Sequence, residues 1–250
     1  MSEVMLQQTQ VSRVVPRWQA FLERFPTAEE CAAAPLGDVL REWQGLGYPR
    51  RARNLHATAQ RVVELGGFPR TLDGLLALPG VGPYTARAVL AFAFELDAAV
   101  VDTNIARVYA RMAGERLTPK RVQAMADAAA PLGDAWVWNQ CLMDLGAVLC
   151  RPTSPGCDQC PVAGACAWRL AGGGDPAIGS SGVSVKQARF DGSDRQARGR
   201  LMRALTAGPV QRAEVAAVMH RDEATAQRLL VDLIREGLCQ PDRLTICLPH

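Results

Sequence analysis

The segment LPGVGPYTA (residues 78–86) is the strongest single indication of this chain's fold. Pro79 ends one helix and Pro83 begins the next, at a position where the missing N–H of proline costs nothing. Between them, Gly80 and Gly82 let the chain turn. Such a turn points free backbone amides outward at a helix N-terminus, which suits a phosphate group. A plain helix–turn–helix connection is the alternative, but the two prolines and the flanking apolar helices favour a phosphate-binding hairpin.

The sequence on both sides of this segment keeps a helical period. One helix is marked by seven apolar residues ahead of Pro26: Val11, Val14, Val15, Trp18, Phe21, Leu22 and Phe25. Further helices are expected at residues 28–34, 36–44, 50–65, 73–78, 83–95, 103–113, 119–130 and 135–147. The connections between them are short, so residues 1–170 predict one all-α domain.

The last third of the chain has a different character. Residues 171–194 are rich in glycine and serine and have almost no apolar period, which predicts a flexible linker. Three helical segments follow near residues 195–206, 211–219 and 222–236. From Leu238 to Leu248 apolar and polar residues alternate, as they do in a small hairpin. We therefore expect residues 195–250 to form a winged-helix-like module.

The composition permits a nucleic-acid partner without proving one. The net charge is only +3, and the 28 basic residues include two lysines, Lys120 and Lys186. The others are arginines, which suit bidentate contacts to phosphate. No stretch has the roughly 18 successive apolar residues of a membrane span, and the N-terminus lacks a secretion signal. We expect a soluble protein that is not exported, with a monomer as the default state.

Four cysteines in one short loop predict a metal centre. They follow the spacing Cys-x6-Cys-x2-Cys-x5-Cys at Cys150, Cys157, Cys160 and Cys166. Four thiolates can close the shell of one soft metal centre, either zinc or an iron–sulfur cluster. Zinc knuckles pair two Cys-x2-Cys couples, whereas only one couple here has that spacing. Spacing alone does not decide between the two metals.

Two carboxylates stand out by their surroundings. Asp102 follows an apolar run and precedes a periodic helix, which makes it a helix N-cap. We expect the helix dipole and amide donors to favour its ionised form, so that it can face a developing cation. Glu3 precedes an unusual cluster of glutamines and a threonine within residues 7–10. A lone glutamate is ordinarily just solvated, but these amides could read bases.

Six segments then occur in the order of a known family across residues 2–168. They are SEVMLQQTQV, GLGYPRRARNLH, LPGVGPYTARAV, VVDTNIARV, NQCLMDLGAVLC and the four-cysteine loop. Together they resemble the iron–sulfur branch of the helix-hairpin-helix DNA glycosylases, and specifically the adenine glycosylases of the MutY type. The resemblance implies two α-helical subdomains with a DNA cleft between them, and a [4Fe–4S] cluster on the four cysteines. It also implies base-excision repair of adenine paired with 8-oxoguanine or guanine, in a bacterial cytoplasm close to the nucleoid.

The resemblance also implies roles for individual residues. Glu3 matches the general acid that protonates the leaving adenine, and Asp102 the carboxylate that stabilises or captures the sugar cation. Asn104 and Tyr84 match residues around that sugar, and Gln140 matches an adenine contact. Breaking the N-glycosidic bond needs a proton on the base and negative charge near C1′, which is consistent with two separate carboxylates.

The remaining matches concern the DNA around the excised base. Four residues match the group that wedges into the duplex and touches the opposite base: Gln8, Thr9, Leu46 and Tyr48. Gly80, Val81 and Gly82 match the phosphate-binding hairpin. The target base must leave the stack, so an aromatic wedge such as Tyr48 would fill the space.

Position 84 bears on the type of reaction. Relatives of the endonuclease III type, which also nick the strand, carry a lysine there that forms a Schiff base. This chain has Tyr84, and its two lysines lie far from the motif. We therefore expect a monofunctional enzyme that leaves an abasic site.

Three departures from the family pattern leave alternatives open. The chain begins two residues before Glu3, so an N-terminally shortened form is expected. Thr103 replaces the usual glycine of the Asp-Gly-Asn motif, which keeps a thymine or uracil mismatch glycosylase as an alternative. The tail is too short for a Nudix-like domain, and its arginines either grip DNA or pack on the core: Arg195, Arg198, Arg200, Arg203 and Arg228. An alternative of another class is a non-catalytic iron–sulfur DNA-binding regulator.

Overall fold

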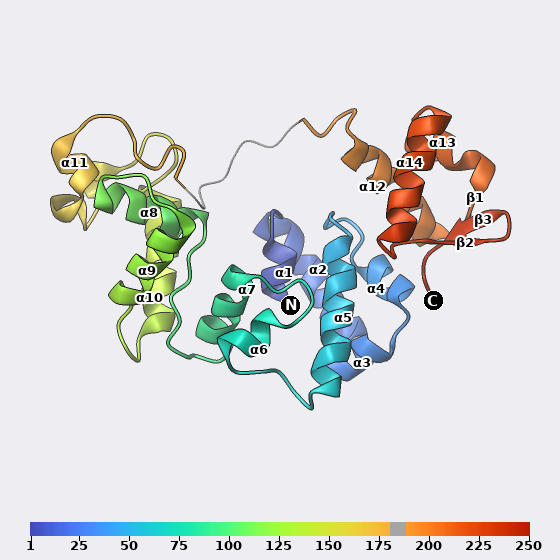
Figure 1. Ribbon diagram of the computed structural model, residues 1–250, viewed down its shortest axis with the longest axis horizontal. Coiled ribbons are helices and arrows are strands. Elements are labelled where there is room, and N and C mark those ends of the chain that lie inside the picture. Colours follow the sequence, from blue (N-terminus) through green and yellow to red (C-terminus); the bar gives the residue numbers. More distant parts are fainter. Residues whose placement is uncertain (181–188) are drawn as a thin grey trace. The chain divides into compact units, whose positions relative to one another are not determined.

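The structure is a computed structural model that describes residues 1–180 and 189–250. The chain divides into two compact units (Figure 1). The first comprises Met1–Pro69, Ala77–Gly80 and the described residues after 188, and the second comprises residues 70–76 and 81–180. The predicted linker at 171–194 falls partly on residues 181–188, which lie outside the described residues. The predicted boundaries at 170 and 195 therefore stay a prediction.

Five helices form the N-terminal part of the first unit. They are α1 (Ser2–Leu6), α2 (Val11–Arg24), α3 (Ala28–Ala33), α4 (Leu36–Glu42) and α5 (Arg50–Glu64). Thr27 caps α3 by accepting a hydrogen bond from the Glu30 amide at 3.2 Å. Pro16 lies inside α2, whose buried face carries Val14 and Phe21. Helices α2 to α5 were expected from the sequence, whereas α1 was not.

The C-terminal part of the first unit is a winged-helix-like module. Its elements are α12 (Asp194–Ala207), β1 (Val210–Gln211), α13 (Val215–Met219), α14 (Glu223–Arg235), β2 (Gln240–Asp242) and β3 (Thr245–Cys247). The strands pair antiparallel in the order β1-β3-β2, with Pro241 opposite Ile246. The predicted hairpin is β2–β3. The sequence pattern did not predict β1, since a two-residue strand carries no alternation to detect.

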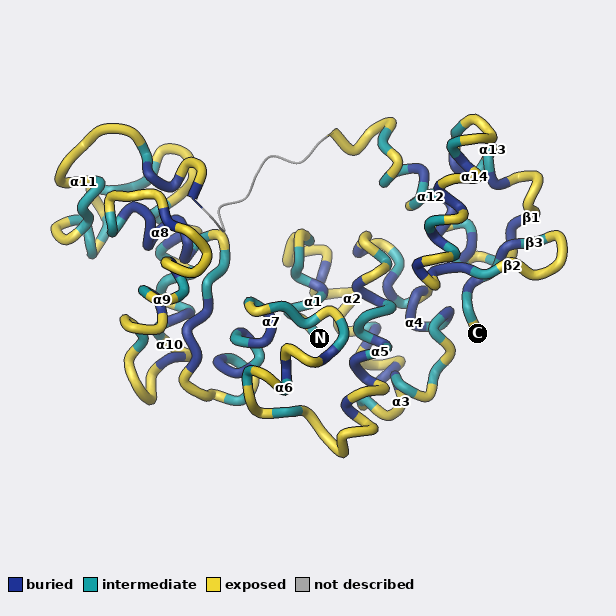
Figure 2. The backbone as a smooth tube through the Cα atoms, viewed as in Figure 1, coloured by how far each residue is buried: buried dark blue, intermediate teal, exposed yellow. Residues whose placement is uncertain are grey.

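One hydrophobic core joins the two parts of the first unit (Figure 2). Met5, Phe21 and Trp43 are buried in the same cluster as Leu201 and Ile246. The chain end adds a backbone contact, because the Gly37 amide donates to the Pro249 carbonyl at 2.9 Å. The C-terminal module is therefore packed on the N-terminal helices as part of one unit.

The second unit holds the helices that carry Asp102 and the cysteines. Its elements are α6 (Leu72–Leu76), α7 (Pro83–Ala88), η1 (Val89–Ala93), α8 (Thr103–Ala113), α9 (Pro119–Ala129), α10 (Ala135–Asp144), η2 (Leu145–Leu149), η3 (Cys157–Gln159), η4 (Ala163–Ala165) and α11 (Ala167–Ala171). The predicted helices at 83–95 and 135–147 occur, but each changes from α to π geometry partway, at η1 and η2. Such π turns are frequent at functional sites.

The all-α fold class predicted from the sequence is confirmed. Within the part of the chain that the structure describes, the β structure is one sheet of three short strands near the C-terminus. Across residues 1–180 and 189–250, no helix combines the length and apolar character that crossing a membrane requires.

Candidate functional site

The predicted phosphate-binding turn is shaped by glycine. Gly80 has φ of +73°, the left-handed region that glycine adopts without strain. A Cβ atom there would lie 2.5 Å from Nδ2 of Asn54 on α5, so a side chain is excluded by space as well as by conformation. The Thr58 hydroxyl donates to the Pro79 carbonyl at 2.7 Å and fixes the start of the turn. Gly82 is the N-cap residue of α7, and Val81 is half-buried beside it.

Asp102 caps α8, as predicted, and both of its carboxylate oxygens are engaged. Oδ1 accepts from the Ile105 amide at 2.6 Å, and Oδ2 accepts from Nδ2 of Asn104 at 3.0 Å. The structure thus brings together two of the four residues that the sequence assigned to catalysis. Asn104 is in turn held by Arg107, whose Nη2 donates to its Oδ1 at 2.8 Å.

The pKa of Asp102 moves in the direction opposite to our expectation. Burial raises it above the ordinary 3.8, and the hydrogen bonds from Ile105 and Asn104 and the charge of Arg107 offset this only in part. The expectation that Asp102 is held in its ionised form stays a prediction. The N-terminus of α8 and its hydrogen-bond donors are present, but the loss of water around the carboxylate raises its pKa by more than they lower it.

Arg107 connects this carboxylate to the cysteine loop, and the sequence analysis did not identify it. It is 3 % exposed, and besides Asn104 it donates to the carbonyls of Gly146 (2.6 Å) and Cys150 (2.7 Å). The backbones approach closely here, since a Cβ on Gly146 would lie 2.7 Å from Cβ of Asn104. The signal in the sequence was a basic residue among the apolar residues of a helix.

Two other predicted residues of the second unit are half-buried. Tyr84 lies in the first turn of α7. Gln140 lies on α10 and donates from Nε2 to Oδ1 of Asp144 at 3.0 Å. Their assignment to the sugar and to the adenine stays a prediction.

In the first unit, the residues assigned to the opposite base lie on two neighbouring turns. The Thr9 hydroxyl donates to the Leu46 carbonyl at 3.3 Å, which joins the two turns directly. Leu46 is buried, whereas Tyr48 is 39 % exposed. Gln8 and Tyr48 have φ of +54° and +49°, a left-handed conformation that is uncommon outside glycine. Strained residues of this kind occur at binding sites, where the surrounding structure holds them in place.

Arg51 holds these two turns together, and the sequence analysis did not identify it. Its Nη1 donates to the carbonyls of Val4 (2.8 Å), Met5 (2.9 Å) and Gln7 (2.6 Å). Its Nη2 donates to Oγ1 of Thr9 (3.1 Å) and to the carbonyls of Leu46 (2.8 Å) and Gly47 (3.1 Å). The guanidinium also lies over the rings of Trp43 and Tyr48, at 5.4 and 5.5 Å from their centroids.

Glu3 lies in the first turn of α1 and is half-buried. The contacts of Arg51 to the carbonyls of Val4 and Met5 tie this short helix to α5. Glu3 belongs to the first unit and Asp102 to the second. Their action on one nucleotide accordingly stays a prediction.

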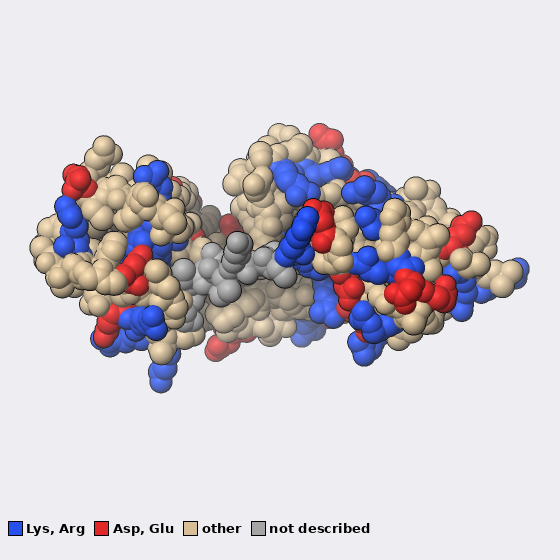
Figure 3. Space-filling model, turned by 90° about the horizontal axis from the view of Figure 1, so that it is seen from above, with Lys and Arg blue, Asp and Glu red and all other residues tan. Residues whose placement is uncertain are grey.

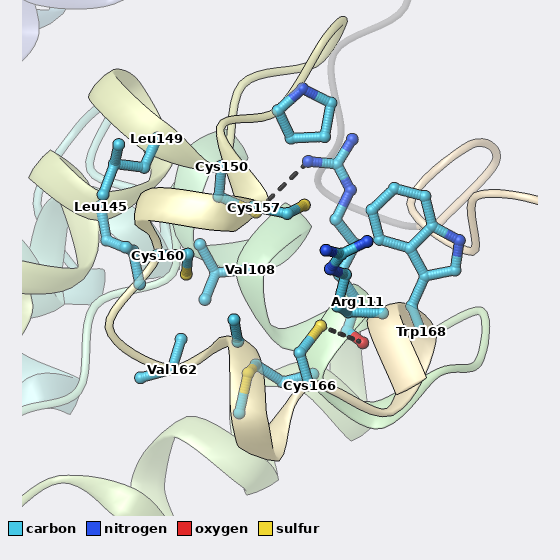
Figure 4. A pocket seen from close by; sticks show the side chains of 14 residues that line it. Val108, Arg111, Leu145, Leu149, Cys150, Cys157, Cys160, Val162, Cys166 and Trp168 are labelled. Carbon is cyan, nitrogen blue, oxygen red and sulfur yellow. Dashed lines mark hydrogen bonds between the residues drawn. The ribbon is translucent and has the colours of Figure 1, made fainter. Parts of the chain in front are cut away.

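All four loop cysteines line one cavity (Figure 4). The cavity, with the solvent at its mouth, has about 400 Å³ of empty space, and its apolar lining includes Val108, Leu145, Leu149 and Val162. Among the described residues, no three His, Cys, Asp or Glu side chains converge as they would around a single ion. Four thiols around one cavity suit a multi-iron cluster in which each thiolate binds its own iron.

Arg111 places buried positive charge at this cavity, which Arg169 also lines. Arg111 is 2 % exposed, and its Nη1 donates to Sγ of Cys150 at 3.2 Å. A bidentate pair with Asp175 (2.6 and 3.1 Å) and a stacked position 4.8 Å from the Trp168 ring centroid fix its orientation. Burial raises the pKa of the Cys150 thiol, and the charges of Arg111 and Arg107 oppose that shift. Soft donors, an apolar wall and buried positive charge together fit an anionic iron–sulfur group.

The arginines of the C-terminal module mostly bind within the protein. Arg198 pairs with Glu236, Arg228 pairs with Asp194 at 2.8 Å, and Arg200 donates to the Met219 carbonyl at 3.3 Å. Figure 3 shows basic and acidic side chains interspersed on the face that it presents. These contacts favour packing over DNA binding for this set of arginines.

Comparisons with known proteins agree with these features. The family model "HhH-GPD superfamily base excision DNA repair protein" matches residues 1–132. An adenine DNA glycosylase of Mycolicibacterium smegmatis is 42% identical over 249 residues, 96% of this chain and 82% of the relative. One of Mycobacterium tuberculosis is 40% identical over 95% of this chain and 80% of the relative. The solved structure of a thermostable thymine-DNA glycosylase matches with a TM-score of 0.65 and 30% identity, over 68% of this chain and 82% of that one.

Proposed function

Since the chain belongs to the adenine DNA glycosylases of the HhH-GPD superfamily, we propose that it hydrolyses the N-glycosidic bond of adenine paired with 8-oxoguanine or guanine in double-stranded DNA. The membership confirms the resemblance seen in the sequence. It does not favour the mismatch-thymine enzyme or the non-catalytic regulator. We propose that the protein acts as a monomer in the bacterial cytoplasm, where the chromosomal DNA lies.

The observation that carries this proposal is the half-buried carboxylate of Asp102 at the start of α8. Its two oxygens are held by Ile105 and Asn104, so it cannot swing away when charge develops nearby. Burial has made its anion less stable than it is in water, as the raised pKa indicates. Such an anion gains more from a cation beside it, because the attraction is strong where water is excluded. The sugar cation formed at C1′ is the partner that this reaction supplies.

The proton for the leaving adenine is assigned to Glu3. A general acid must stay within hydrogen-bond reach of the base nitrogen that it protonates. Five residues of α1 do not make a stable helix alone, and the buried guanidinium of Arg51 binds this helix to the unit's core. Arg51 therefore supports the placement of Glu3.

The absence of lysine at position 84 supports a monofunctional reaction. Tyr84 cannot form a Schiff base, which takes an amine nucleophile. Lys120 lies on α9, and the elements η1 and α8 separate it from α7 along the chain. Water is therefore the proposed nucleophile, and an abasic site the product.

We propose that Cys150, Cys157, Cys160 and Cys166 hold a [4Fe–4S] cluster. When bound, the cluster supplies a rigid crosslink for the loop and no acid or base. Arg111 would balance its negative charge, and Arg107 links the loop to Asn104 and through it to Asp102. The loop carries Arg151 outward, where it suits a DNA phosphate.

The test is single-turnover base release from duplexes that contain A:8-oxoG, A:G or T:G. We expect release of adenine from the first two and strand scission only after alkali. Scission without alkali, or trapping by borohydride, would contradict the monofunctional reaction. Release of thymine alone would support the mismatch-thymine enzyme, and release from none would support the regulator.

Substitutions at the carboxylates complete the test. Glu3→Gln and Asp102→Asn should each lower the rate by about 10²- to 10⁴-fold. Asparagine is a good N-cap, so Asp102→Asn should leave α8 formed. Asp222→Asn is the matched control, because Asp222 caps α14 in the same way, by accepting from the Thr225 amide at 2.9 Å. It should react at the wild-type rate.

A further inference from the structure

The C-terminal module contacts the tyrosine that the sequence assigns to the duplex wedge. Nη1 of Arg195, near the start of α12, donates to the Tyr48 hydroxyl at 3.2 Å across 147 positions of sequence. This is a contact between a module without an assigned task and a residue expected to touch DNA. It lies within the first unit, at the protein surface.

Tyr48 is a residue whose position has to be maintained by its neighbours. Its φ of +49° lies in the left-handed region, which costs a residue with a side chain about 1–2 kcal/mol. Gly47 before it has φ of +72°, and Pro49 after it restricts the backbone as well. Inside the protein the ring lies over Arg51, and at its outer end the hydroxyl accepts from Arg195.

Arg195 is itself firmly placed. The Ser193 side chain caps α12 by accepting from the Gln196 amide at 3.3 Å. Next to Arg195, Asp194 pairs with Arg228 of α14 at 2.8 Å. The buried face of α12 belongs to the same core as Leu46, two residues from Tyr48.

A second link attaches the module to the segment that follows Tyr48. Glu236, at the end of α14, is 8 % exposed and accepts from Arg50 at 2.8 Å and from Arg198. Its carbonyl also accepts from Nη1 of Arg53. Arg50 and Arg53 form the first turn of α5, directly after Tyr48 and Pro49. The module therefore contacts the Tyr48 side chain through Arg195 and the start of α5 through Glu236.

We propose that the C-terminal module positions Tyr48 for insertion into the duplex, and that Arg195 is the positioning residue through which it does so. The inference rests on the proposed function, because it assigns the module a part in substrate recognition by that same site. A tyrosine that fills the gap beside an extruded base loses less entropy on insertion when it is already oriented.

The experiment is a double-mutant cycle with Arg195→Ala, Tyr48→Phe and the double variant. Two quantities are measured on A:8-oxoG duplexes: the single-turnover rate of adenine release, and the fluorescence of 2-aminopurine placed beside the mismatch, which rises when the stack opens. Each single variant should lower the rate about 3- to 10-fold, the effect of losing one hydrogen bond at the protein surface. The double variant should be no slower than the slower single one.

Two further variants separate positioning from folding. Arg195→Lys keeps the charge and one donor, so it should recover part of the rate and of the fluorescence change. Arg235→Ala removes an exposed arginine of the same module that pairs with Asp232. This control should match the wild type in both measurements and in its thermal unfolding midpoint.

The outcomes separate this inference from the proposed function. Wild-type protein that opens the stack but releases no adenine would contradict the function while the fluorescence still tests Arg195. Active wild-type protein with an unchanged Arg195→Ala variant would overturn the inference. Fully additive losses in the double variant would overturn it too, since they would mean that Arg195 acts apart from Tyr48.

Discussion

Replacing Arg51 by methionine should release the N-terminal residues that carry Glu3 and disable the enzyme. The substitution keeps most of the volume and removes six hydrogen bonds, five of them to backbone carbonyls. Each carbonyl left buried without a donor costs about 1–3 kcal/mol. Some of these carbonyls lie near the surface, where water can replace the Arg51 donor. The free energy of unfolding should therefore fall by about 3–5 kcal/mol, as it does for other buried charged networks.

A loss of this size is a large part of a typical domain's stability of about 5–15 kcal/mol. Urea unfolding measures it directly, and hydrogen exchange over residues 2–10 shows whether α1 detaches first. If α1 detaches, adenine release should fall by at least the factor expected for Glu3→Gln, because Glu3 is then no longer held. Arg51→Lys should be intermediate, since an ammonium group has three donors and no planar fork.

Arg61→Met is the matched control for Arg51→Met. Arg61 lies on the same helix, is exposed, and pairs only with Glu64 at 2.9 Å among the contacts described for its side chain. Its loss should cost no more than about 0.5 kcal/mol. An Arg51→Met protein with the wild-type urea midpoint, protected amides at 2–10 and the wild-type rate would refute the role assigned to Arg51.

Three further predictions concern the second unit and the turn that leads to it. The raised pKa of Asp102 should place the acid limb of the single-turnover rate above pH 3.8, with the rate falling as Asp102 is protonated; an acid limb at or below that value would contradict this. The same shift has the opposite sign for folding, because stability from this group increases as the pH falls from the folded pKa towards 3.8. Arg111→Met should lower the iron content and the absorbance near 400 nm, whereas Arg61→Met, which breaks an exposed pair with Glu64 away from the cavity, should not; equal iron in both would contradict the role of Arg111. Gly80→Ala should destabilise by about 1–3 kcal/mol more than Gly66→Ala, since both glycines have positive φ but only Gly80 faces a side chain at 2.5 Å; equal losses would contradict the contact.

Local patterns predicted most of the helices of this protein. The apolar period of α2 and the N-cap at Asp102 are local features, and the structure has both. The π turns η1 and η2 and the strand β1 were missed for a common reason. Each depends on what packs against it, as the close approach of Gly146 to Asn104 illustrates, and leaves no periodic signal.

The residues that organise the sites were not predicted, although they are among the most buried charges. Arg51, Arg107 and Arg111 bind carbonyls or side chains that lie 43 to 64 positions away in the longest of their contacts. Contacts between residues this far apart in the sequence cannot be predicted from a single sequence. The available signal was an arginine on the apolar face of a helix, and it occurs three times in α5 and α8.

The direction of the Asp102 pKa shows a further limit of sequence reasoning. A capping position identifies the donors that stabilise a carboxylate, but it does not reveal how much water the fold removes. Here burial outweighs the Ile105 and Asn104 hydrogen bonds. For catalysis this is the useful outcome, since an anion that water does not satisfy responds more strongly to a cation at C1′.

The number and geometry of its donors explain why arginine rather than lysine occupies positions 51, 107 and 111. One planar guanidinium offers five N–H donors in fixed directions, so a single residue can bind several carbonyls on different segments. Arg107 does this by holding Asn104, Gly146 and Cys150 at once, and Asn104 in turn holds Asp102. A displacement of the cysteine loop would therefore reach the Asp102 carboxylate through three hydrogen bonds. The cysteine loop and the Asp102 carboxylate are, on this reasoning, mechanically coupled, so loss of the proposed cluster should slow base release even though it would take no part in the proton transfer.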